Sequence, residues 1–323
     1  MSRSVFAALA MSVAFAAVAH AQTKPAYPVK PIRLVVAFSP GGTPDTLARL
    51  IAPKMSENWK QPVVVENRAG AGGTIATSIV AKATPDGYTI LAHSNGFAIT
   101  GAITPNLAYD PRKDFSCIAT LGYSTTVLVV PPSLGVKSVK ELIALANAQP
   151  GKVFFGSAGA GSGTHFNAEK FRLAAGIKVQ HVAFKGQPEF LLEIVAGRVQ
   201  FGVAGLGPSM AHIKEGRLLP LAVVLPKRAP SLPDVPASSE VLPAWTRDGA
   251  SQAWIAPAGT PRPILDQVSR ELARILTLPE IRDRLQTYDF HVTPSTPEEC
   301  DRQLRADIES FRKVGLAAGL ISK

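Results

Sequence analysis

Residues 39–45, Ser-Pro-Gly-Gly-Thr-Pro-Asp, have the types and the spacing that could bind an anion. They lie between an apolar run, 32–38, typical of a buried strand, and apolar residues at helical spacing. Thr43 suits the N-cap of that helix and Pro44 its first position, where the missing N–H costs nothing. The free N–H groups of a helix N-terminus bind carboxylate or phosphate without a charged side chain. The alternative is a tight strand-to-helix turn that binds nothing.

A second segment of this kind is 156–165, Gly-Ser-Ala-Gly-Ala-Gly-Ser-Gly-Thr-His. It follows the apolar strand residues 153–155 and precedes an amphipathic helix that begins near Phe166. Its glycines let the backbone approach a ligand closely, and its serines supply hydroxyl donors. A flexible linker is the alternative, but the position between a strand and a helix argues against it. Two such segments predict a cleft with donors on both walls.

Candidate catalytic groups are few. Asp45 could be taken for a base, but we expect its carboxylate to accept hydrogen bonds from backbone N–H groups of its own turn. His165 is either a donor that faces a ligand or a residue of the helix start. No nucleophile elbow, P-loop or zincin motif occurs, and the glycines miss the dinucleotide-binding spacing. The histidines show no metal-ligand spacing. We therefore predict a binding protein, with no enzyme activity, cofactor or metal.

The elements that must position these segments alternate between strand and helix, which predicts an α/β fold with mainly parallel sheets. Further strands are expected at 63–65, 88–91 and 127–130, and further helices over 75–83, after Ser138 and after Thr296. Pro53 is expected to kink the helix that begins at Pro44. The chain exceeds the length of one ordinary core, which predicts two lobes.

The N-terminal segment 1–21 has the pattern of a secretory signal peptide. Arg3 precedes a short apolar stretch, and Ala19-His20-Ala21 matches a cleavage site after Ala21. We therefore expect a protein exported to the periplasm, without a lipid anchor because no cysteine follows the cleavage site. The net charge is +10, but no block of five like charges occurs in the sequence. This distribution argues against a nucleic-acid-binding protein, whereas a modest positive field suits anionic small molecules.

Cys117 and Cys300 are the two cysteines. An oxidising compartment permits a disulfide between them. Two isolated cysteines do not form a disulfide framework, however, and we expect two small buried residues that are not paired.

The chain resembles the solute-binding proteins of tripartite tricarboxylate transporters, also called Bug receptors. The matching stretches, in the order of the family, are 38–42 with Asp45, 65–68 with 70–73, 85–89, 156–163 with His165, 181–186, 208–209, 227–236 and 256–261. They span nearly all of the chain that follows the expected signal peptide. No single stretch is decisive, but the ordered set is specific.

The resemblance implies a two-lobed periplasmic-binding-protein fold, type II-like, that closes on its ligand. The expected first lobe comprises 28–124 and about 249–295, the second about 125–248, and 296–323 form a C-terminal helix packed on the lobes. The expected ligand-binding residues are Ser39, Gly41, Gly42, Thr43, Asp45, Gly72, Gly73, His93, Ser94 and Asn95 on one wall, and Ser157, Ala158, Ser162, Gly163, Thr164, His165, Lys185, Ala204 and Gly205 on the other.

The implied function is that of a monomeric receptor that captures a small organic carboxylate for a membrane permease. The alternative is a receptor that uses the same site but presents itself to a two-component sensor kinase. The chain departs from the family pattern at 203–205, Val-Ala-Gly, at Phe184, and at 187–189, Gln-Pro-Glu. The small apolar residues at 203–205 suggest a wall with fewer donors, and hence a carboxylate with a less polar body, such as an aromatic acid.

Overall fold

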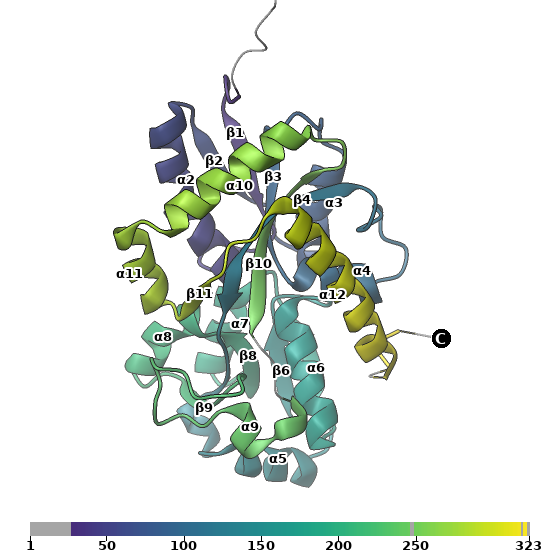
Figure 1. The fold of residues 1–323 in the computed structure, drawn as a ribbon. Helices are drawn as coiled ribbons and strands as arrows, with labels where there is room; N and C mark the ends of the chain where they lie inside the picture. The colour runs from purple at the N-terminus through teal and green to yellow at the C-terminus, as the bar shows by residue number, and fades with distance from the viewer. Residues whose placement is uncertain (1–26, 246–248, 318, 322–323) are drawn as a thin grey trace, which may run out of the picture.

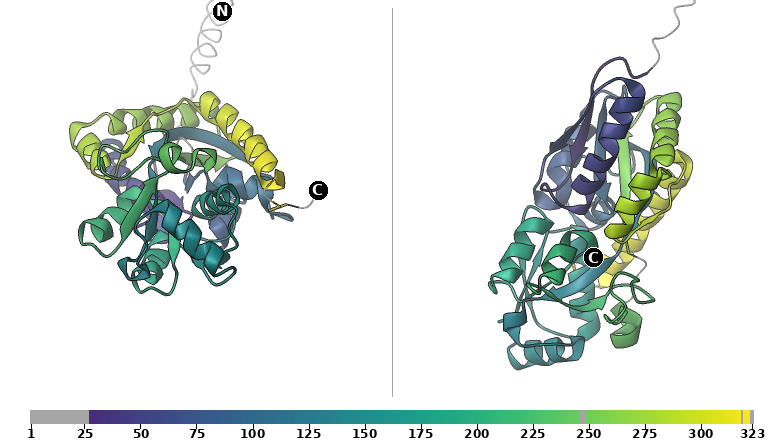
Figure 2. Two further views of the ribbon diagram at one scale, coloured as in Figure 1. Left: turned by 90° about the horizontal axis from the view of Figure 1, so that it is seen from below. Right: turned by 90° about the vertical axis from the view of Figure 1, so that its left-hand side faces the viewer.

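The computed structural model describes residues 27–245, 249–317 and 319–321. The expected signal peptide, 1–21, lies outside the described residues. The chain forms two sheets with helices on both faces, and Figures 1 and 2 show them as two halves stacked end to end.

The first sheet has the strand order β11-β4-β10-β3-β1-β2. Its strands are β1 (Ile32–Val36), β2 (Val63–Asn67), β3 (Thr89–Ser94), β4 (Phe115–Ser124), β10 (Ala250–Pro257) and β11 (Phe290–Val292). The pairs β1–β2 and β1–β3 are parallel, whereas β10 runs antiparallel to β3 and β4, and β11 antiparallel to β4. Strands β1 to β4 therefore point in one direction and β10 and β11 in the other.

Helices cover both faces of this sheet, because successive strand residues point to opposite sides. Leu34 and Ile90 pack against α2 (Thr43–Trp59), α10 (Arg262–Leu276) and α11 (Pro279–Thr287). Val35 and Leu91 pack on the side of α3 (Thr74–Ala81), α4 (Gly96–Ile103) and α12 (Pro297–Ala317). The strands consequently read as continuous apolar runs rather than as alternating ones.

The second sheet has the order β7-β6-β8-β5-β9. Its strands are β5 (Thr126–Val130), β6 (Phe154–Ser157), β7 (Gln180–Ala183), β8 (Phe201–Gly205) and β9 (Leu219–Val223). On one face lie α5 (Val139–Ala148) and α6 (Gly163–Ala175), with the short α9 (Ser238–Val241) nearby; on the other lie α7 (Gln187–Val195) and α8 (Leu206–Lys214). Only β5 runs against the other strands of this sheet. Both sheets are therefore mixed with a parallel majority, and the α/β prediction is confirmed.

The chain passes from the first sheet to the second at Thr125, which joins β4 to β5, and it returns between β9 and β10. Helix α12 lies against α4, and its Phe311 ring stands 5.2 Å from Phe166 of α6, so it contacts both halves. We propose that the lobes are divided at these connections, with 28–124 and about 249–295 in one lobe and about 125–248 in the other.

Helix α2 begins one residue earlier than the sequence suggested. Gly42 is the N-cap, with extended backbone angles, and Thr43 is the first helical residue. The expectation that Thr43 caps the helix was therefore wrong: its side chain stands inside the first turn, and no side chain caps α2. The helix continues through Pro53 to Trp59.

Cys117 and Cys300 form a disulfide, with Cα atoms 5.7 Å apart, so the expectation of two unpaired cysteines was wrong. Cys117 lies on β4 and Cys300 in the first turns of α12, which packs across that strand. Sequence spacing could not show this, because the two positions are separated by 183 residues and are brought together only by the packing of α12.

Reduction of this disulfide should lower stability. A cross-link that spans 183 residues removes much of the chain entropy of the unfolded state, and we expect a loss of about 2–5 kcal/mol in the free energy of unfolding. Urea unfolding of the oxidised protein, the reduced protein and the Cys117→Ser, Cys300→Ser double variant measures it. Equal midpoints for all three would contradict the prediction.

Within the described residues, no helix has both the length and the apolar character needed to cross a membrane.

Candidate functional site

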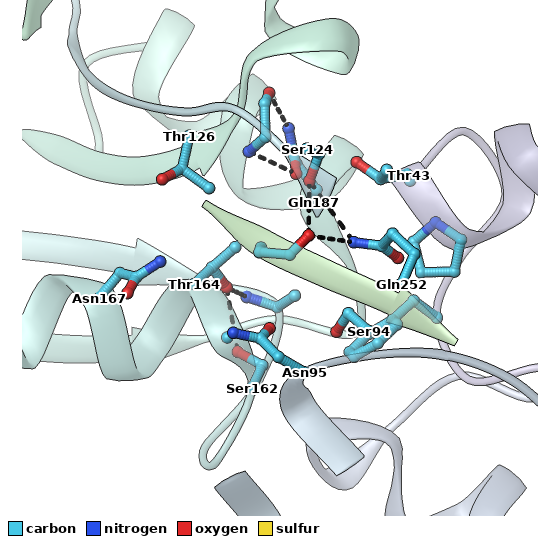
Figure 3. A pocket seen from close by; sticks show the side chains of 17 residues that line it. Thr43, Ser94, Asn95, Ser124, Thr126, Ser162, Thr164, Asn167, Gln187 and Gln252 are labelled. Atoms are coloured by element: carbon cyan, nitrogen blue, oxygen red, sulfur yellow. Dashed lines mark hydrogen bonds between the residues drawn. The ribbon is translucent and has the colours of Figure 1, made fainter. Parts of the chain in front are cut away.

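A cavity of about 490 Å³, counting its open mouth, lies between the two halves. It is lined by Phe38, Gly42, Thr43, Pro44, Ser94, Asn95, Ser124, Ala250 and Gln252 from the first half, and by Thr126, Ala158, Ser162, Gly163, Thr164, Asn167, Gln187 and Gly205 from the second. Figure 3 shows these 17 side chains. The volume falls within the range of pockets that hold small ligands.

The lining mixes apolar and polar groups and carries no charged side chain among these 17 residues. Ten of them have a hydroxyl or a carboxamide, and these are labelled in Figure 3. Several of these polar groups are buried without a partner among the described residues: both amide atoms of Asn95, Oγ1 of Thr126, Nδ2 of Asn167 and Oε1 of Gln252. Buried polar groups without partners are costly, so their presence around one cavity indicates a place where a ligand supplies the missing hydrogen bonds.

Five helices begin at this cavity. Gly42, Asn95, Ser162 and Gly205 are the N-caps of α2, α4, α6 and α8, and Gln187 is the first residue of α7. The first N–H groups of a helix have no partner inside it, and each N-terminus carries a partial positive charge. The convergence of five N-termini on an uncharged cavity is an arrangement that favours an anion.

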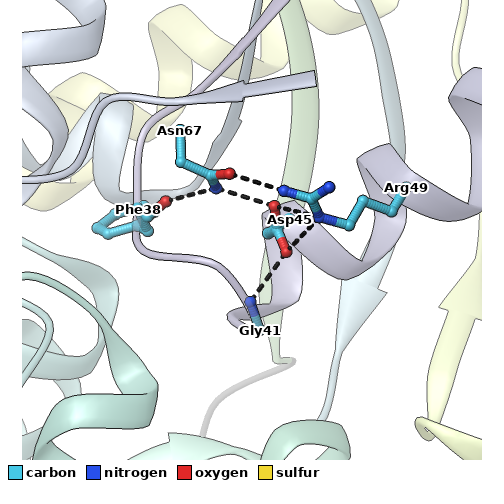
Figure 4. A network of polar contacts seen from close by, with 5 residues as sticks. All are labelled: Phe38, Gly41, Asp45, Arg49 and Asn67. Atoms are coloured by element: carbon cyan, nitrogen blue, oxygen red, sulfur yellow. Dashed lines mark hydrogen bonds and ion pairs between the residues drawn. The ribbon is translucent and has the colours of Figure 1, made fainter. Parts of the chain in front are cut away.

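The turn that leads into α2 is held by Asp45, which is 2% exposed. Its carboxylate accepts hydrogen bonds from Gly41 N (2.9 Å) and Asn67 Nδ2 (2.8 Å) and pairs with Arg49 Nε (3.0 Å), as Figure 4 shows. The Asn67 amide also donates to the Phe38 carbonyl oxygen. The expected bond from Asp45 to a backbone N–H of its own turn is confirmed, and Asp45 does not line the cavity.

Replacing Asp45 by alanine should destabilise this turn. The change leaves the Gly41 N–H and one N–H of the Asn67 amide without an acceptor, and we expect a loss of about 2–3 kcal/mol in the free energy of unfolding together with weaker ligand binding. Asp266→Ala is a matched control, because Asp266 also forms an i,i+4 pair with an arginine but at the surface, where such pairs contribute little. A similar loss in both variants, measured by urea unfolding, would contradict the prediction.

Of the residues proposed from the sequence, the structure places nine on the cavity wall: Gly42, Thr43, Ser94, Asn95, Ala158, Ser162, Gly163, Thr164 and Gly205. Ten others do not line it: Ser39, Gly41, Asp45, Gly72, Gly73, His93, Ser157, His165, Lys185 and Ala204. Lys185 is exposed, and Ala204 is fully buried in the core beneath the wall.

Some of these ten residues lie where the two halves touch. A Cβ at Gly72 would stand 2.1 Å from the carbonyl oxygen of Ala160, and one at Gly186 2.7 Å from Cβ of Ser39. The Ser39 hydroxyl donates to Oε1 of Glu189, 2.5 Å away on α7. These contacts join the turns of the first half to the 156–165 loop and to α7 of the second. The structure is thus a closed arrangement, in which small residues permit the close approach.

Three histidines lie beside the cavity rather than in its lining; His93 and His165 are buried, and His181 is half-buried. Burial lowers the pKa of His93 to about 4, and its Nδ1 lies 2.9 Å from the Ser94 carbonyl oxygen. His165 and His181 lie with ring centroids 4.1 Å apart, and burial lowers the pKa of each to about 4. His165 Nδ1 accepts from Gly161 N, which favours the helix-start role. Among the described residues, no His, Cys, Asp and Glu cluster could hold a metal.

Pro44, part of the 39–45 segment, also lines the cavity, whereas sequence reasoning missed the other lining residues: Phe38, Ser124, Thr126, Asn167, Gln187, Ala250 and Gln252. The departure of 187–189 from the family pattern was a sequence signal that Gln187 could belong to the site. The amide of Gln187 donates to the Gly205 carbonyl (2.8 Å) and accepts from Gly205 N (3.0 Å). A carboxamide therefore stands against the wall where 203–205 suggested an apolar surface, but both of its polar atoms are bonded to Gly205. The expectation of few donors there stays a prediction.

This fold and cavity define a two-lobed binding protein. The family described as "Tripartite tricarboxylate transporter family receptor" matches residues 47–313. BugT of Bordetella pertussis is 31% identical over 314 residues, which cover 96% of each chain. A protein of R. palustris solved with adipate superposes with a TM-score of 0.87 at 32% identity, over 91% of this chain and 98% of that one. MatC of Rhodopseudomonas palustris with bound malate gives 0.85 at 29% identity, over 89% and 99%.

The chain belongs to the receptor family of tripartite tricarboxylate transporters, whose members are solute-binding receptors. The resemblance recognised in the sequence is therefore confirmed.

Proposed function

We propose that the protein captures a small organic carboxylate in the periplasm, as a monomer, and delivers it to the membrane permease of a tripartite tricarboxylate transporter. The observation that carries this proposal is the convergence of five helix N-termini on a cavity without charged side chains. Helix N-termini stabilise an anion by fixed dipoles and N–H donors. Structural relatives solved with adipate and malate support the ligand class.

The body of the ligand meets a wall of mixed polarity. Phe38, Pro44, Ala158 and Ala250 give apolar contacts between the hydroxyl and carboxamide groups. An aliphatic or an aromatic acid with polar substituents suits this lining, because the apolar patches bury carbon while the polar groups orient the ligand. The contacts between the halves support enclosure of the ligand, and we propose that the permease recognises this closed form.

Titration calorimetry of the chain from Gln22 onward tests the ligand class. The panel is citrate, succinate, adipate, malate, benzoate, terephthalate and nicotinate, each beside its neutral amide. We expect micromolar binding of at least one acid and no measurable binding of the matching amide, since the helix N-termini favour the charged form. An amide that binds as tightly as its acid, or a panel without any binding, would contradict the proposal.

Uptake of the bound acid, labelled with carbon-14, tests the transport role. Cells that lack the receptor gene should lose high-affinity uptake and regain it with the wild-type chain. A strain that also lacks the permease subunits is the control, because there the receptor should restore nothing. Undiminished uptake without the permease would show that the receptor serves another partner.

A further inference from the structure

Two of the four carboxamides at the cavity have an orientation that the backbone fixes. The first is Gln187, whose Nε2 faces the Gly205 carbonyl and whose Oε1 faces the Gly205 N–H. A carbonyl only accepts and an N–H only donates, so the amide cannot be turned over. Gln187 thus uses its oxygen and one N–H on the backbone and serves as a wall of the cavity.

The second is Gln252 of β10, which is 3% exposed. Its Nε2 donates to the Ala250 carbonyl (3.3 Å) and to Oγ of Ser124 (3.5 Å), and the Ser124 hydroxyl itself donates to the same carbonyl (3.3 Å). Figure 3 shows the amide nitrogen of Gln252 directed to Ser124. The Ala250 carbonyl therefore fixes this amide too, and the oxygen is left on the other side.

Oε1 of Gln252 is buried and has no hydrogen-bond partner among the described residues. An amide oxygen can only accept, and a buried acceptor without a donor is costly. A carboxylate cannot relieve this, because an ionised carboxylate has no donor. The group that donates the missing hydrogen bond to Oε1 of Gln252 must be an O–H or N–H group.

We infer that the ligand carries a hydrogen-bond donor, a hydroxyl or an N–H, in addition to its carboxylate, and that Gln252 Oε1 accepts from it. This inference rests on the proposed function and narrows it to hydroxy, amino or amido acids. Gln252 is then a specificity-determining residue. A site built around a buried acceptor rejects an analogue that lacks the donor more strongly than an apolar pocket rejects a missing methylene.

Matched pairs of acids that differ in one hydroxyl test the inference by calorimetry. The pairs are succinate and malate, glutarate and 2-hydroxyglutarate, and benzoate and 3-hydroxybenzoate. In the wild-type protein the hydroxylated member of the best-bound pair should bind at least about tenfold more tightly, since the other member leaves the acceptor unpaired.

Gln252→Met keeps the length of the side chain and removes the acceptor. We expect the preference within the pair to shrink to about twofold or less, with the affinity for the plain acid kept or raised. Gln303→Met, on the exposed face of α12, is the control and should keep the wild-type preference.

Plain acids that bind the wild-type protein as tightly as their hydroxylated partners would overturn the inference while leaving the carboxylate proposal intact. A preference that survives in Gln252→Met would overturn the role of Gln252. No binding of any acid would overturn the proposed function and this inference together. The wild-type comparison decides even where the variant does not fold.

Discussion

Replacing Gly72 by alanine should lower ligand affinity about 100-fold while the protein still folds. Gly72 lies in the turn before α3, and a Cβ there would stand 2.1 Å from the carbonyl oxygen of Ala160 and 3.3 Å from Ser162 N, on the opposite half. Because Ala160 contributes a backbone atom, no side-chain rotation relieves the clash. Overpacking of this kind costs roughly 1–3 kcal/mol, which the closed form alone would bear.

The effect is expected on binding because Gly72 and Ala160 belong to opposite halves, which we expect to separate in the ligand-free open form. A ligand that needs the closed form loses affinity in proportion to the fall in its population. Gly72 also has a positive φ of 64°, so alanine strains its backbone in any form. That intrinsic strain must be separated from the clash.

The variant Gly176→Ala is the control that separates the backbone strain from the clash. Gly176 has nearly the same backbone angle, φ 65°, but a Cβ there meets nothing within 4 Å. Both variants should lose a similar amount of stability, about 1 kcal/mol, in thermal unfolding without ligand. Only Gly72→Ala should lose affinity in calorimetry with the acid that the wild-type protein binds best. Equal affinities for the two variants would show that the 72–160 contact does not accompany binding.

The outline of the fold could be predicted because it depends on local patterns. The apolar runs at 32–36 and 127–130 are buried on both faces, and the glycine segments after β1 and β6 lead into helices as expected. Strand–turn–helix units leave this signature in the sequence whatever their partners are.

The cavity was harder to predict from the sequence, because many of its lining residues lie at positions without a local sequence signal. Ser124, Thr126, Ala250 and Gln252 lie near the connections through which the chain passes between the two sheets, and only the pairing of β10 with β4 brings Gln252 to Ser124. The cysteine pair was missed for the same reason. Gly72 and Ser39 were predicted to bind the ligand; in the structure they contact the opposite half and do not line the cavity.

The free energy of unfolding should fall as the pH is lowered from about 6.5 to about 4. Burial lowers the pKa of His93 to about 4, against 6.5 for an unperturbed histidine. Above pH 6.5 both the folded and the unfolded protein hold this ring neutral, and its contribution is complete. Between pH 6.5 and 4 the unfolded protein binds a proton that the folded protein does not, so stability decreases with decreasing pH. For His93 alone the loss reaches about 3 kcal/mol.

His165 and His181 should add to this loss, since burial lowers the pKa of both, with a further lowering by the Arg172 charge for His165 and by His165 for His181. Urea unfolding between pH 7 and 4.5 measures the slope, and the variant His93→Asn should flatten it by removing one of the three rings. Proton NMR of the imidazole Cε1–H signals gives the site-specific check: the rings of residues 93, 165 and 181 should still be neutral at pH 5. Titration of His93 near pH 6.5 in the folded protein would contradict the prediction. It would show that packing against Phe38 and Phe97 does not hold the ring neutral.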